Sequence, residues 1–400
     1  MTDAVVITGI GVVSPLGLSA SEVARRWCAG EHAVRPLDAM GVDGALGATV
    51  EEIPLDAIPP DKRTRIGRLD RLCRLFLSTA YLAVDAAGVR VADADAERVG
   101  LSFGTGLGCL LTDAEYNQKL VEQGPSAASP RLFAYTVSSA AAGEVSIALG
   151  IKGANVTSHA GLAAGLHAIG YGFDLIRMGK ADVVLAGGAD ALGESLLRGL
   201  RDMRLLKSHA AQPFREPVAG VCPAEGAAVV VLERGDRARQ RRARVWARVD
   251  GYAAGFEPTL TTRQREHTGI AQTMQRALAL SGHTAGEIGL AMTSAHGTAL
   301  DAVELAALRA VLAQAHDPLL CAPKAAWGET FGADGALSLA LAAALLSAPV
   351  RALDTECFGL DGTALQAAES AARLRRARLA LVHSLCYAGP TVTLVLAREE

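Results

Sequence analysis

Residues 153–170, with the sequence Gly-Ala-Asn-Val-Thr-Ser-His-Ala-Gly-Leu-Ala-Ala-Gly-Leu-His-Ala-Ile-Gly, precede a helical pattern and the apolar run Ala-Asp-Val-Val-Leu-Ala-Gly-Gly at 181–188. We interpret the segment as a glycine-rich turn that leads into a tightly packed helix and then into a buried strand. Many enzymes hold a nucleophile at the end of such a helix, where the helix dipole and backbone N–H groups favour an anion. The segment contains no cysteine, so the missing nucleophile is the first functional question.

The composition is that of a globular protein, with 400 residues, 50% of them hydrophobic, and a formal net charge of -3. This length suits one large or two medium α/β domains, and the near-neutral charge argues against nucleic acid as a partner. No stretch approaches the roughly 18 consecutive apolar residues of a membrane helix, and no basic leader precedes the apolar run Ala4–Ile10. We therefore expect a cytoplasmic protein that is neither exported nor membrane-spanning.

The seven cysteines are scattered, with no CxxC motif and no other metal-ligand spacing. An odd number at irregular spacing suggests neither a disulfide framework nor a zinc site. We predict no metal and no cofactor, and we expect most of these cysteines to be small buried side chains.

Helix and strand patterns alternate along most of the chain, which predicts parallel sheets with helical crossovers. Both halves begin with a strand, alternate helix and strand, and end in two consecutive strands. We therefore divide the chain into an N-terminal half, 1–244, and a C-terminal half, 245–400. The apolar helices predicted at 166–178 and 336–347 would be equivalent and sandwiched between two sheets.

Two segments of the first half fit this alternation less clearly. Residues 104–108, Gly-Thr-Gly-Leu-Gly, follow a predicted strand but lack the third glycine of a dinucleotide-binding turn, so we interpret them as a packing turn. Residues 110–134 show no regular pattern, and we expect them to be irregular.

Four loops carry chemically active side chains, and they come where predicted strands end, which is where ligands gather in α/β folds. They are 153–170, Thr293-Ser-Ala-His-Gly-Thr298, Cys321-Ala-Pro-Lys-Ala-Ala-Trp-Gly-Glu-Thr-Phe-Gly332 and His383-Ser-Leu-Cys-Tyr-Ala-Gly-Pro390. In this order, with the opening Val6-Ile-Thr-Gly-Ile-Gly-Val-Val-Ser-Pro-Leu-Gly17, they resemble the β-ketoacyl-acyl carrier protein synthases, the condensing enzymes of the thiolase fold. The resemblance covers nearly the whole chain. It implies an α/β thiolase-like fold, with internally duplicated βαβαβαββ halves in a layered α-β-α-β-α core.

In that family a cysteine at a helix N-terminus accepts the acyl group, two histidines assist decarboxylation of malonyl-carrier protein, and a lysine orders the site. Carried over by position, the cysteine falls on Leu162, whose alkyl side chain cannot attack a thioester. His296 matches the first histidine and Lys324 the lysine, whereas the second histidine falls on Glu329. An anion there would oppose a developing enolate. Tyr387 falls where the family has the phenylalanine that gates the acyl pocket.

In lacking the catalytic cysteine and the second histidine, the sequence resembles the chain length factors. These are ketosynthase-like subunits that form heterodimers with an active ketosynthase in type II polyketide and aryl polyene pathways. The resemblance implies a cysteine-bearing ketosynthase and an acyl carrier protein as partners, in polyketide, aryl polyene or fatty-acid-like biosynthesis. Two alternatives stay open at this point. One is a self-sufficient enzyme that transfers acyl groups or decarboxylates malonyl-carrier protein without a cysteine, using His296 as base; the other is a homodimeric carrier-protein-binding module.

Further residues take their expected roles from the resemblance. Phe133 and Tyr135 fall where chains of the family cross the dimer interface, so we expect them, with Tyr387, to shape the acyl tunnel. The basic residues that would attract an acidic carrier protein are Lys62, Arg63, Arg65 and Arg68, for which a solvated helix face is the equal alternative.

The candidate catalytic residues can also be interpreted as purely structural. His296 can be a buried histidine satisfied by backbone groups, and His167 is expected to be a packed core residue. Lys324 and Glu329 are predicted to form an ion pair with a structural role.

Overall fold

The structure is a computed structural model that describes residues 4–42, 44–91, 96–215, 217, 219–258 and 265–399, with the side chains of residues 39, 64 and 65 outside the description. The strands are β1 (Val5–Val13), β2 (Arg35–Pro36), β3 (Leu46–Gly47), β4 (Val99–Gly104), β5 (Asn155–Ser158), β6 (Val183–Asp190), β7 (Gly226–Arg234), β8 (Ala247–Phe256), β9 (Ile288–Met292), β10 (Leu319–Cys321), β11 (Cys357–Phe358), β12 (Leu379–Leu385) and β13 (Pro390–Ala397). The α-helices are α1 (Ala20–Cys28), α2 (Arg71–Ala87), α3 (Leu110–Gln123), α4 (Pro130–Phe133), α5 (Ala140–Leu149), α6 (Ala164–Arg177), α7 (Glu194–Asp202), α8 (Gly235–Gln240), α9 (His267–Ser281), α10 (Ala299–Leu312), α11 (Lys324–Trp327), α12 (Asp334–Ser347) and α13 (Ala367–Arg376).

The main sheet has 11 strands in the order β11-β10-β9-β12-β13-β8-β1-β7-β6-β4-β5. Strands of the first half occupy one end and strands of the second half the other. The two ends meet where β1 pairs with β8 through three residues, Val5 to Ile7. At the far end of the first half, β5 pairs on one side only, with β4.

The sheet is mixed, so the expectation of parallel sheets holds only in part. Strands β6, β4 and β5 are parallel, as are β12, β9 and β10. The other neighbours, such as β12 and β13, are antiparallel. A short turn joins β12 to β13, and consecutive strands joined by a tight turn pair antiparallel, whereas a parallel pair needs a long crossover.

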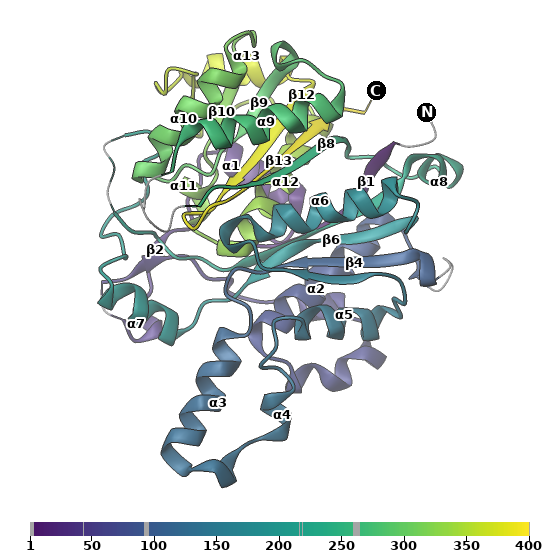
Figure 1. The fold of residues 1–400 in the computed structure, drawn as a ribbon, viewed down its shortest axis with the longest axis vertical. Coiled ribbons are helices and arrows are strands. Elements are labelled where there is room, and N and C mark those ends of the chain that lie inside the picture. Colours follow the sequence, from purple (N-terminus) through teal and green to yellow (C-terminus); the bar gives the residue numbers. More distant parts are fainter. Residues whose placement is uncertain are drawn as a thin grey trace.

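Helices α6 and α12 lie between the two ends of the sheet, as Figure 1 shows for α6 between β6 and β8. Helix α6 contacts β4, β6 and β7 as well as β8 and β13, while α12 contacts β12 and β7. Small residues allow this close approach: at Gly165 and Gly170 a β-carbon would collide with Gly332 or with the ring of Tyr252. The predicted burial of both helices is confirmed. Helices α2 and α5 cover the outer face of the first half, and α9 and α10 cover that of the second.

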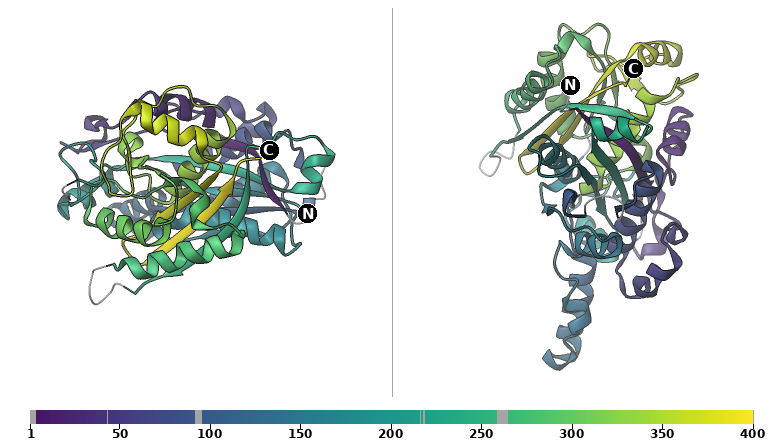
Figure 2. Two further views of the ribbon diagram at one scale, coloured as in Figure 1. Left: turned by 90° about the horizontal axis from the view of Figure 1, so that it is seen from above. Right: turned by 90° about the vertical axis from the view of Figure 1, so that its right-hand side faces the viewer.

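The segment 110–134 forms helices α3 and α4, which corrects the expectation of irregular structure. The two helices make an arm that protrudes from the body in Figures 1 and 2. Of the residues in α3, Thr112 is buried. A helix with so few core contacts has little hydrophobic periodicity, which is why the sequence pattern missed it.

The turn 104–108 packs against the start of α6, where a β-carbon on Gly104 would collide with the backbone of Ala164. The predicted packing turn is therefore confirmed. The buried carboxylate of Asp190 fixes the turn by accepting hydrogen bonds from the N–H groups of Gly106 at 2.8 Å and Leu107 at 3.1 Å. It also accepts the N–H of Gly332, from the other half of the chain, at 2.6 Å.

Within the described ranges, no helix is long and apolar enough to cross a bilayer, and no group of three or more His, Cys, Asp or Glu side chains is arranged to hold a metal ion. The seven cysteines are free thiols, and five of them are buried.

Candidate functional site

Leu162 lies in a short 3-10 helix, Gly161–Ala163, between β5 and α6. Gly161 takes the left-handed conformation, with φ of 57°, and a β-carbon there would collide with the thiol of Cys386. The carbonyl of Leu162 accepts a hydrogen bond from the Ser384 hydroxyl at 3.2 Å. Its side chain packs against an apolar cluster that includes Phe331. The nucleophile position is therefore built into the packing of the fold and offers no reactive atom.

The loop after β9 holds His296 firmly. The carboxylate of Asp301 accepts the backbone N–H groups of His296, Gly297 and Thr298 at 3.3, 2.8 and 3.1 Å. Asp301 also completes the capping box that starts α10. From the opposite side, the ammonium group of buried Lys207 donates to the carbonyls of His296 at 2.9 Å and Gly297 at 2.7 Å.

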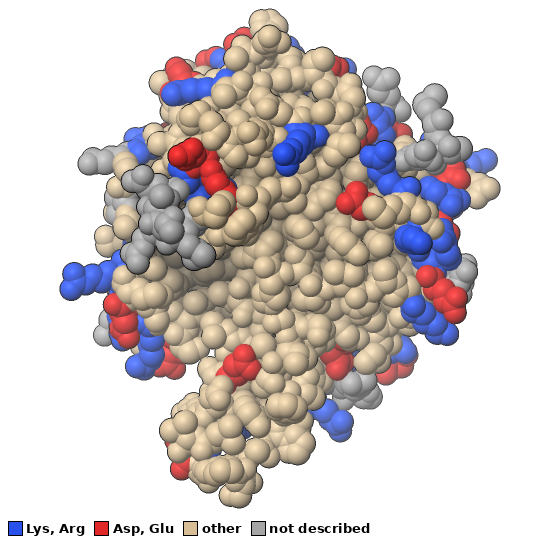
Figure 3. All heavy atoms as spheres, in the orientation of Figure 1, with Lys and Arg blue, Asp and Glu red and all other residues tan. Residues whose placement is uncertain are grey.

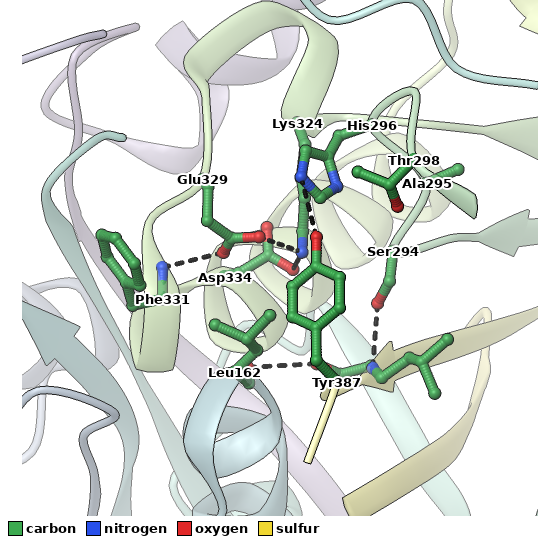
Figure 4. Close-up of polar contacts among 12 residues, drawn as sticks. Leu162, Ser294, Ala295, His296, Thr298, Lys324, Glu329, Phe331, Asp334 and Tyr387 are labelled. Atoms are coloured by element: carbon green, nitrogen blue, oxygen red, sulfur yellow. Dashed lines mark hydrogen bonds and ion pairs between the residues drawn. The ribbon is translucent and has the colours of Figure 1, made fainter. Parts of the chain in front are cut away.

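His296 is buried, and its Nε2 lies 3.2 Å from the hydroxyl of Tyr387, as Figure 4 shows. Burial lowers the pKa of His296 well below its usual range, and the positive charges of Lys324 and Lys207 lower it further. The imidazole is therefore neutral at physiological pH. A neutral imidazole beside a phenol can exchange a hydrogen bond, but nothing in the contact supplies a nucleophile.

Lys324 forms an ion pair with Glu329, at 2.7 Å from Nζ to Oε2, as the sequence predicted. Its ammonium group also lies 3.5 Å from Oδ2 of Asp334, so one buried cation faces two buried carboxyl groups. Burial by itself would lower the pKa of Lys324, but Asp334 and Glu329 outweigh it and raise the pKa above its usual range. Burial raises the pKa of Asp334 to about 7, while the charge of Lys324 opposes this rise.

The Glu329 side chain is held at both oxygens, because Oε1 accepts the backbone N–H of Phe331 at 2.9 Å while Oε2 faces Lys324. A carboxylate in this position can only accept hydrogen bonds. The hydrogen-bond donor that an enolate or oxyanion requires is therefore absent from this side chain, and the local charge has the wrong sign.

Tyr387 lies in the turn between β12 and β13, 40% exposed, with its hydroxyl directed inward at His296. Burial raises the pKa of the phenol above its usual range, and the charge of Glu329 adds to the rise. The buried side chain of Arg265 fixes the turn by donating to the carbonyl of Cys386 at 2.5 Å and to the hydroxyl of Thr391 at 2.5 Å.

The structure thus brings Leu162, His296, Lys324, Glu329 and Tyr387 together, as Figure 4 shows, from four separate loops. Three further residues of the site escaped the sequence analysis: Lys207, Arg265 and Asp334. Lys207 and Arg265 lie in stretches without a regular pattern. Each donates to backbone carbonyls far away in the sequence, a type of partner that leaves no local signal. Asp334 carried a usable signal, because an acidic residue interrupts an otherwise apolar helix start.

The remaining predicted residues lie outside this cluster. Phe133 is 63% exposed on α4 and packs against the ring of Tyr116. The Tyr135 hydroxyl donates to Glu144 at 2.9 Å. Their contribution to a tunnel stays a prediction.

The basic run lies in a 3-10 helix, Pro60–Arg68. Lys62, Arg63 and Arg68 are exposed, and the guanidinium of Arg63 donates to the carbonyls of Ile58 at 2.6 Å and Asp56 at 2.8 Å. The Arg65 side chain lies outside the described residues. Arg63 therefore stabilises its own loop, and a docking role for the run stays a prediction.

Comparison with known proteins identifies the family. Residues 2–238 match the sequence model of the β-ketoacyl synthase N-terminal domain, and residues 246–351 match that of the C-terminal domain. The chain is 29% identical over 424 residues to 3-oxoacyl-[acyl-carrier-protein] synthase 2 of Rhizobium meliloti (strain 1021), covering 98% of each chain. It is 34% identical over 255 residues to Nodulation protein E of Rhizobium leguminosarum bv. trifolii, covering 63% of each.

Solved structures share the fold over the full length of the chain. The ishigamide ketosynthase/chain length factor matches with a TM-score of 0.86 at 24% identity, covering 100% of both chains. A type II polyketide synthase structure, AntDE:AntF, described as an acyl-carrier protein in complex with its ketosynthase, matches with a TM-score of 0.84 at 20% identity, also covering 100% of both chains. The predicted thiolase-like ketosynthase fold is confirmed, and the chain belongs to the β-ketoacyl synthase family.

Proposed function

We propose that this protein is a chain length factor subunit, which does not condense acyl groups alone and pairs with a cysteine-bearing ketosynthase. In that complex the partner carries the acyl group, and this chain shapes the acyl tunnel at the shared interface. The observation that carries the proposal is Leu162 at the head of α6, packed against an apolar cluster where the family's nucleophile belongs.

The buried cluster of Lys324, Glu329 and Asp334 supports the same conclusion. The lysine is neutralised by an ion pair at 2.7 Å, and the carboxylate occupies the position from which a histidine would donate. Restoring condensation would therefore require at least two changes, a thiol at position 162 and a donor at position 329. The ketosynthase fold is present, but the nucleophile at position 162 and the hydrogen-bond donor at position 329 are absent. This combination fits a subunit that acts through its partner.

The surface next to the site supports a partner chain. Among the described residues, β5 pairs with β4 alone, and an unpaired edge strand is a template for pairing with another chain. Exposed apolar side chains lie on neighbouring helices, with Phe133 63% exposed on α4 and Ile147 62% exposed on α5. Figure 3 shows few charged residues over α6 and the arm, which suits a face that a partner covers.

Co-expression with a cysteine-bearing ketosynthase tests the proposal. We expect a one-to-one complex by native mass measurement, product formation by the complex, and no condensation of acyl- and malonyl-carrier protein by this chain alone. Phe133→Asp should weaken the complex, whereas Leu280→Asp, at an exposed leucine of α9 in the other half, should not. Condensation by the purified single chain, or no complex with any cysteine-bearing ketosynthase of the same gene cluster, would refute the proposal.

The hydrogen bond between His296 and Tyr387 favours one second candidate, a cysteine-independent decarboxylase or acyltransferase with His296 as base. The substitution His296→Ala separates the two functions. A complex that assembles normally and turns over unchanged supports the chain length factor, and a normal complex with lost turnover supports chemistry at His296.

A further inference from the structure

A pocket of about 370 Å³ lies beside α1 and the end of α12, at the far end of α12 from the candidate site. Helix α12 begins at Asp334, in the charge cluster of the site, and ends at Ser347, which lines the pocket. A helix of 14 residues is roughly 20 Å long, so the two places are well separated. The volume lies within the range of about 300–1,000 Å³ that is usual for small-molecule sites.

Most of the pocket wall is apolar. Its side chains come from α1, from the end of α12 and the segment after it, and from the start of β8; they include Ala24, Ala344, Leu345, Pro349, Val350 and Trp246. The Cys28 thiol adds to this wall, because burial raises its pKa to about 12 and keeps it un-ionised at physiological pH. The wall therefore suits the apolar body of a ligand.

The pocket also carries positive charge. Three arginines line it, and all three are exposed: Arg25, Arg244 and Arg351. Arg25 lies 3.9 Å from Glu31, whereas Arg244 and Arg351 form no ion pair with a carboxylate anywhere in the described ranges. The pocket contains one acidic residue, Asp354, which offsets one of these two charges. An excess of about one positive charge remains, which a monoanion would neutralise.

Trp246 has an indole N–H without an acceptor. The residue is 7% exposed, and its backbone N–H donates to the carbonyl of Ile7 at 2.8 Å. Its Nε1 is shielded from solvent and has no hydrogen-bond partner among the described groups. The guanidinium of Arg244 lies over the indole, 3.9 Å from the ring centroid. A buried donor without an acceptor costs about 1–3 kcal/mol, so a ligand that brings an acceptor recovers free energy here.

A structural role explains only part of this arrangement. Helices α1 and α12 both end beside the pocket, at Cys28 and Ser347, and cations are favourable near the C-terminal ends of helices. This effect accounts for arginines at this place. It accounts neither for the apolar wall nor for the indole N–H, and both of these match a ligand that joins an apolar body to a hydrogen-bond acceptor.

We propose that this pocket binds a small monocarboxylic acid, with its apolar body against the wall and its carboxylate bound by Arg244 and Arg351. A carboxylate matches the planar fork of an arginine through two parallel hydrogen bonds. When it pairs with Arg244, it draws that side chain off the ring and brings an oxygen to the indole N–H of Trp246. The inference adds a ligand site to the chain and holds whether or not the chain is a chain length factor.

Titration with cyclohexanecarboxylate, followed by calorimetry and by tryptophan fluorescence, tests the pocket. We expect binding with a change in emission that Trp246→Phe removes, because the other two tryptophans, Trp27 and Trp327, are buried and do not line the pocket. In calorimetry, Arg244→Gln and Arg351→Gln should each weaken binding about tenfold through the loss of charge-assisted hydrogen bonds. Both arginines are exposed, so these changes leave the core intact.

Three controls fix the place and the chemistry of binding. Arg375→Gln, at an exposed arginine at the end of α13, should bind the acid like the wild type. Ala348→Phe, at an exposed alanine of the pocket, should fill the cavity and abolish binding. The neutral cyclohexanecarboxamide should bind about tenfold more weakly than the acid.

Three results would each overturn the inference: no binding of the acid by the wild type, equal binding of acid and amide, or binding that Ala348→Phe and both arginine variants leave unchanged. None of these measurements involves a ketosynthase or a carrier protein. Failure of this inference is therefore distinct from failure of the proposed function.

Discussion

The substitution Lys324→Met probes the buried charge cluster of the candidate site. Methionine is close to lysine in length and fills the same space, but it removes the cation that faces Glu329 at 2.7 Å and Asp334 at 3.5 Å. Two buried carboxyl groups are then left without a counter-charge. Removing one partner of a buried pair costs about 3–5 kcal/mol.

Protonation limits this loss. Burial already raises the pKa of Asp334 to about 7, so this carboxyl can take up a proton in the folded variant, which removes one of the two uncompensated charges. We therefore expect a cost of about 3–4 kcal/mol. With an unfolding entropy of roughly 0.8 kcal/mol/K for a chain of this size, the melting temperature should fall by about 4–5 °C.

Thermal denaturation of the variant beside Lys119→Met checks the value. Lys119 pairs with Glu115 at the same distance, 2.7 Å, but on the surface, so its loss should cost below about 1 kcal/mol, or about 1 °C. In Lys324→Met the buried carboxyl of Asp334 binds a proton in the folded state that it loses on unfolding, so stability falls as pH rises through its raised pKa. The deficit should be smaller at pH 5 than at pH 8. A fall no larger than in Lys119→Met, or an equal deficit at both pH values, refutes the reasoning.

Three other predictions concern the site and the core. Leu162→Cys should leave the chain unable to condense acyl- and malonyl-carrier protein in a product assay, because a thiol alone supplies no donor for the enolate, and any product would contradict this. Burial raises the pKa of Glu304 to about 8, so between about pH 4.5 and 8 the folded state keeps a proton that the unfolded state has lost, and stability falls as pH rises. In Glu304→Gln the midpoint of urea denaturation should therefore depend less on pH across that window. An unchanged pH dependence of the midpoint would count against this reasoning. In the same assay, Gly170→Ala should lower the free energy of unfolding by about 1–3 kcal/mol, because the added β-carbon collides with the ring of Tyr252. Gly199→Ala, which has open space around it in α7, should raise the free energy of unfolding by about 0.4–1 kcal/mol. Equal effects of the two substitutions would refute the packing argument.

Much of the layered core could be predicted because its elements carry local signals. Helix α12 is apolar on all sides and buried throughout, and such a helix belongs between two layers. The positions of Leu162, His296, Lys324 and Glu329 followed from the family resemblance that four loops carry, and the structure places them together. The division into residues 1–244 and 245–400 stays a prediction.

The missed features are those without a local signal. The arm helix α3 buries almost nothing against the body, so it lacks the periodicity by which amphipathic helices are found. The mixed sheet depends on pairings such as β1 with β7 and β8, which join segments more than 200 residues apart. Lys207 binds carbonyl groups 89 and 90 residues further along the chain, and any residue type can supply a carbonyl.

The hydrogen-bond donors to Asp190 come from two distant parts of the chain, and one part is synthesised much later than the other. Its donors Gly106 and Leu107 precede it in the chain, but Gly332 follows 142 residues later. During translation, the carboxylate can therefore gain the hydrogen bond from Gly332 only after most of the second half has left the ribosome. A chain cut between the halves would keep every strand of the first and still lack the donor that holds the packing turn 104–108 against the second. One buried carboxylate thus has its full set of donors only when both parts of the chain are present.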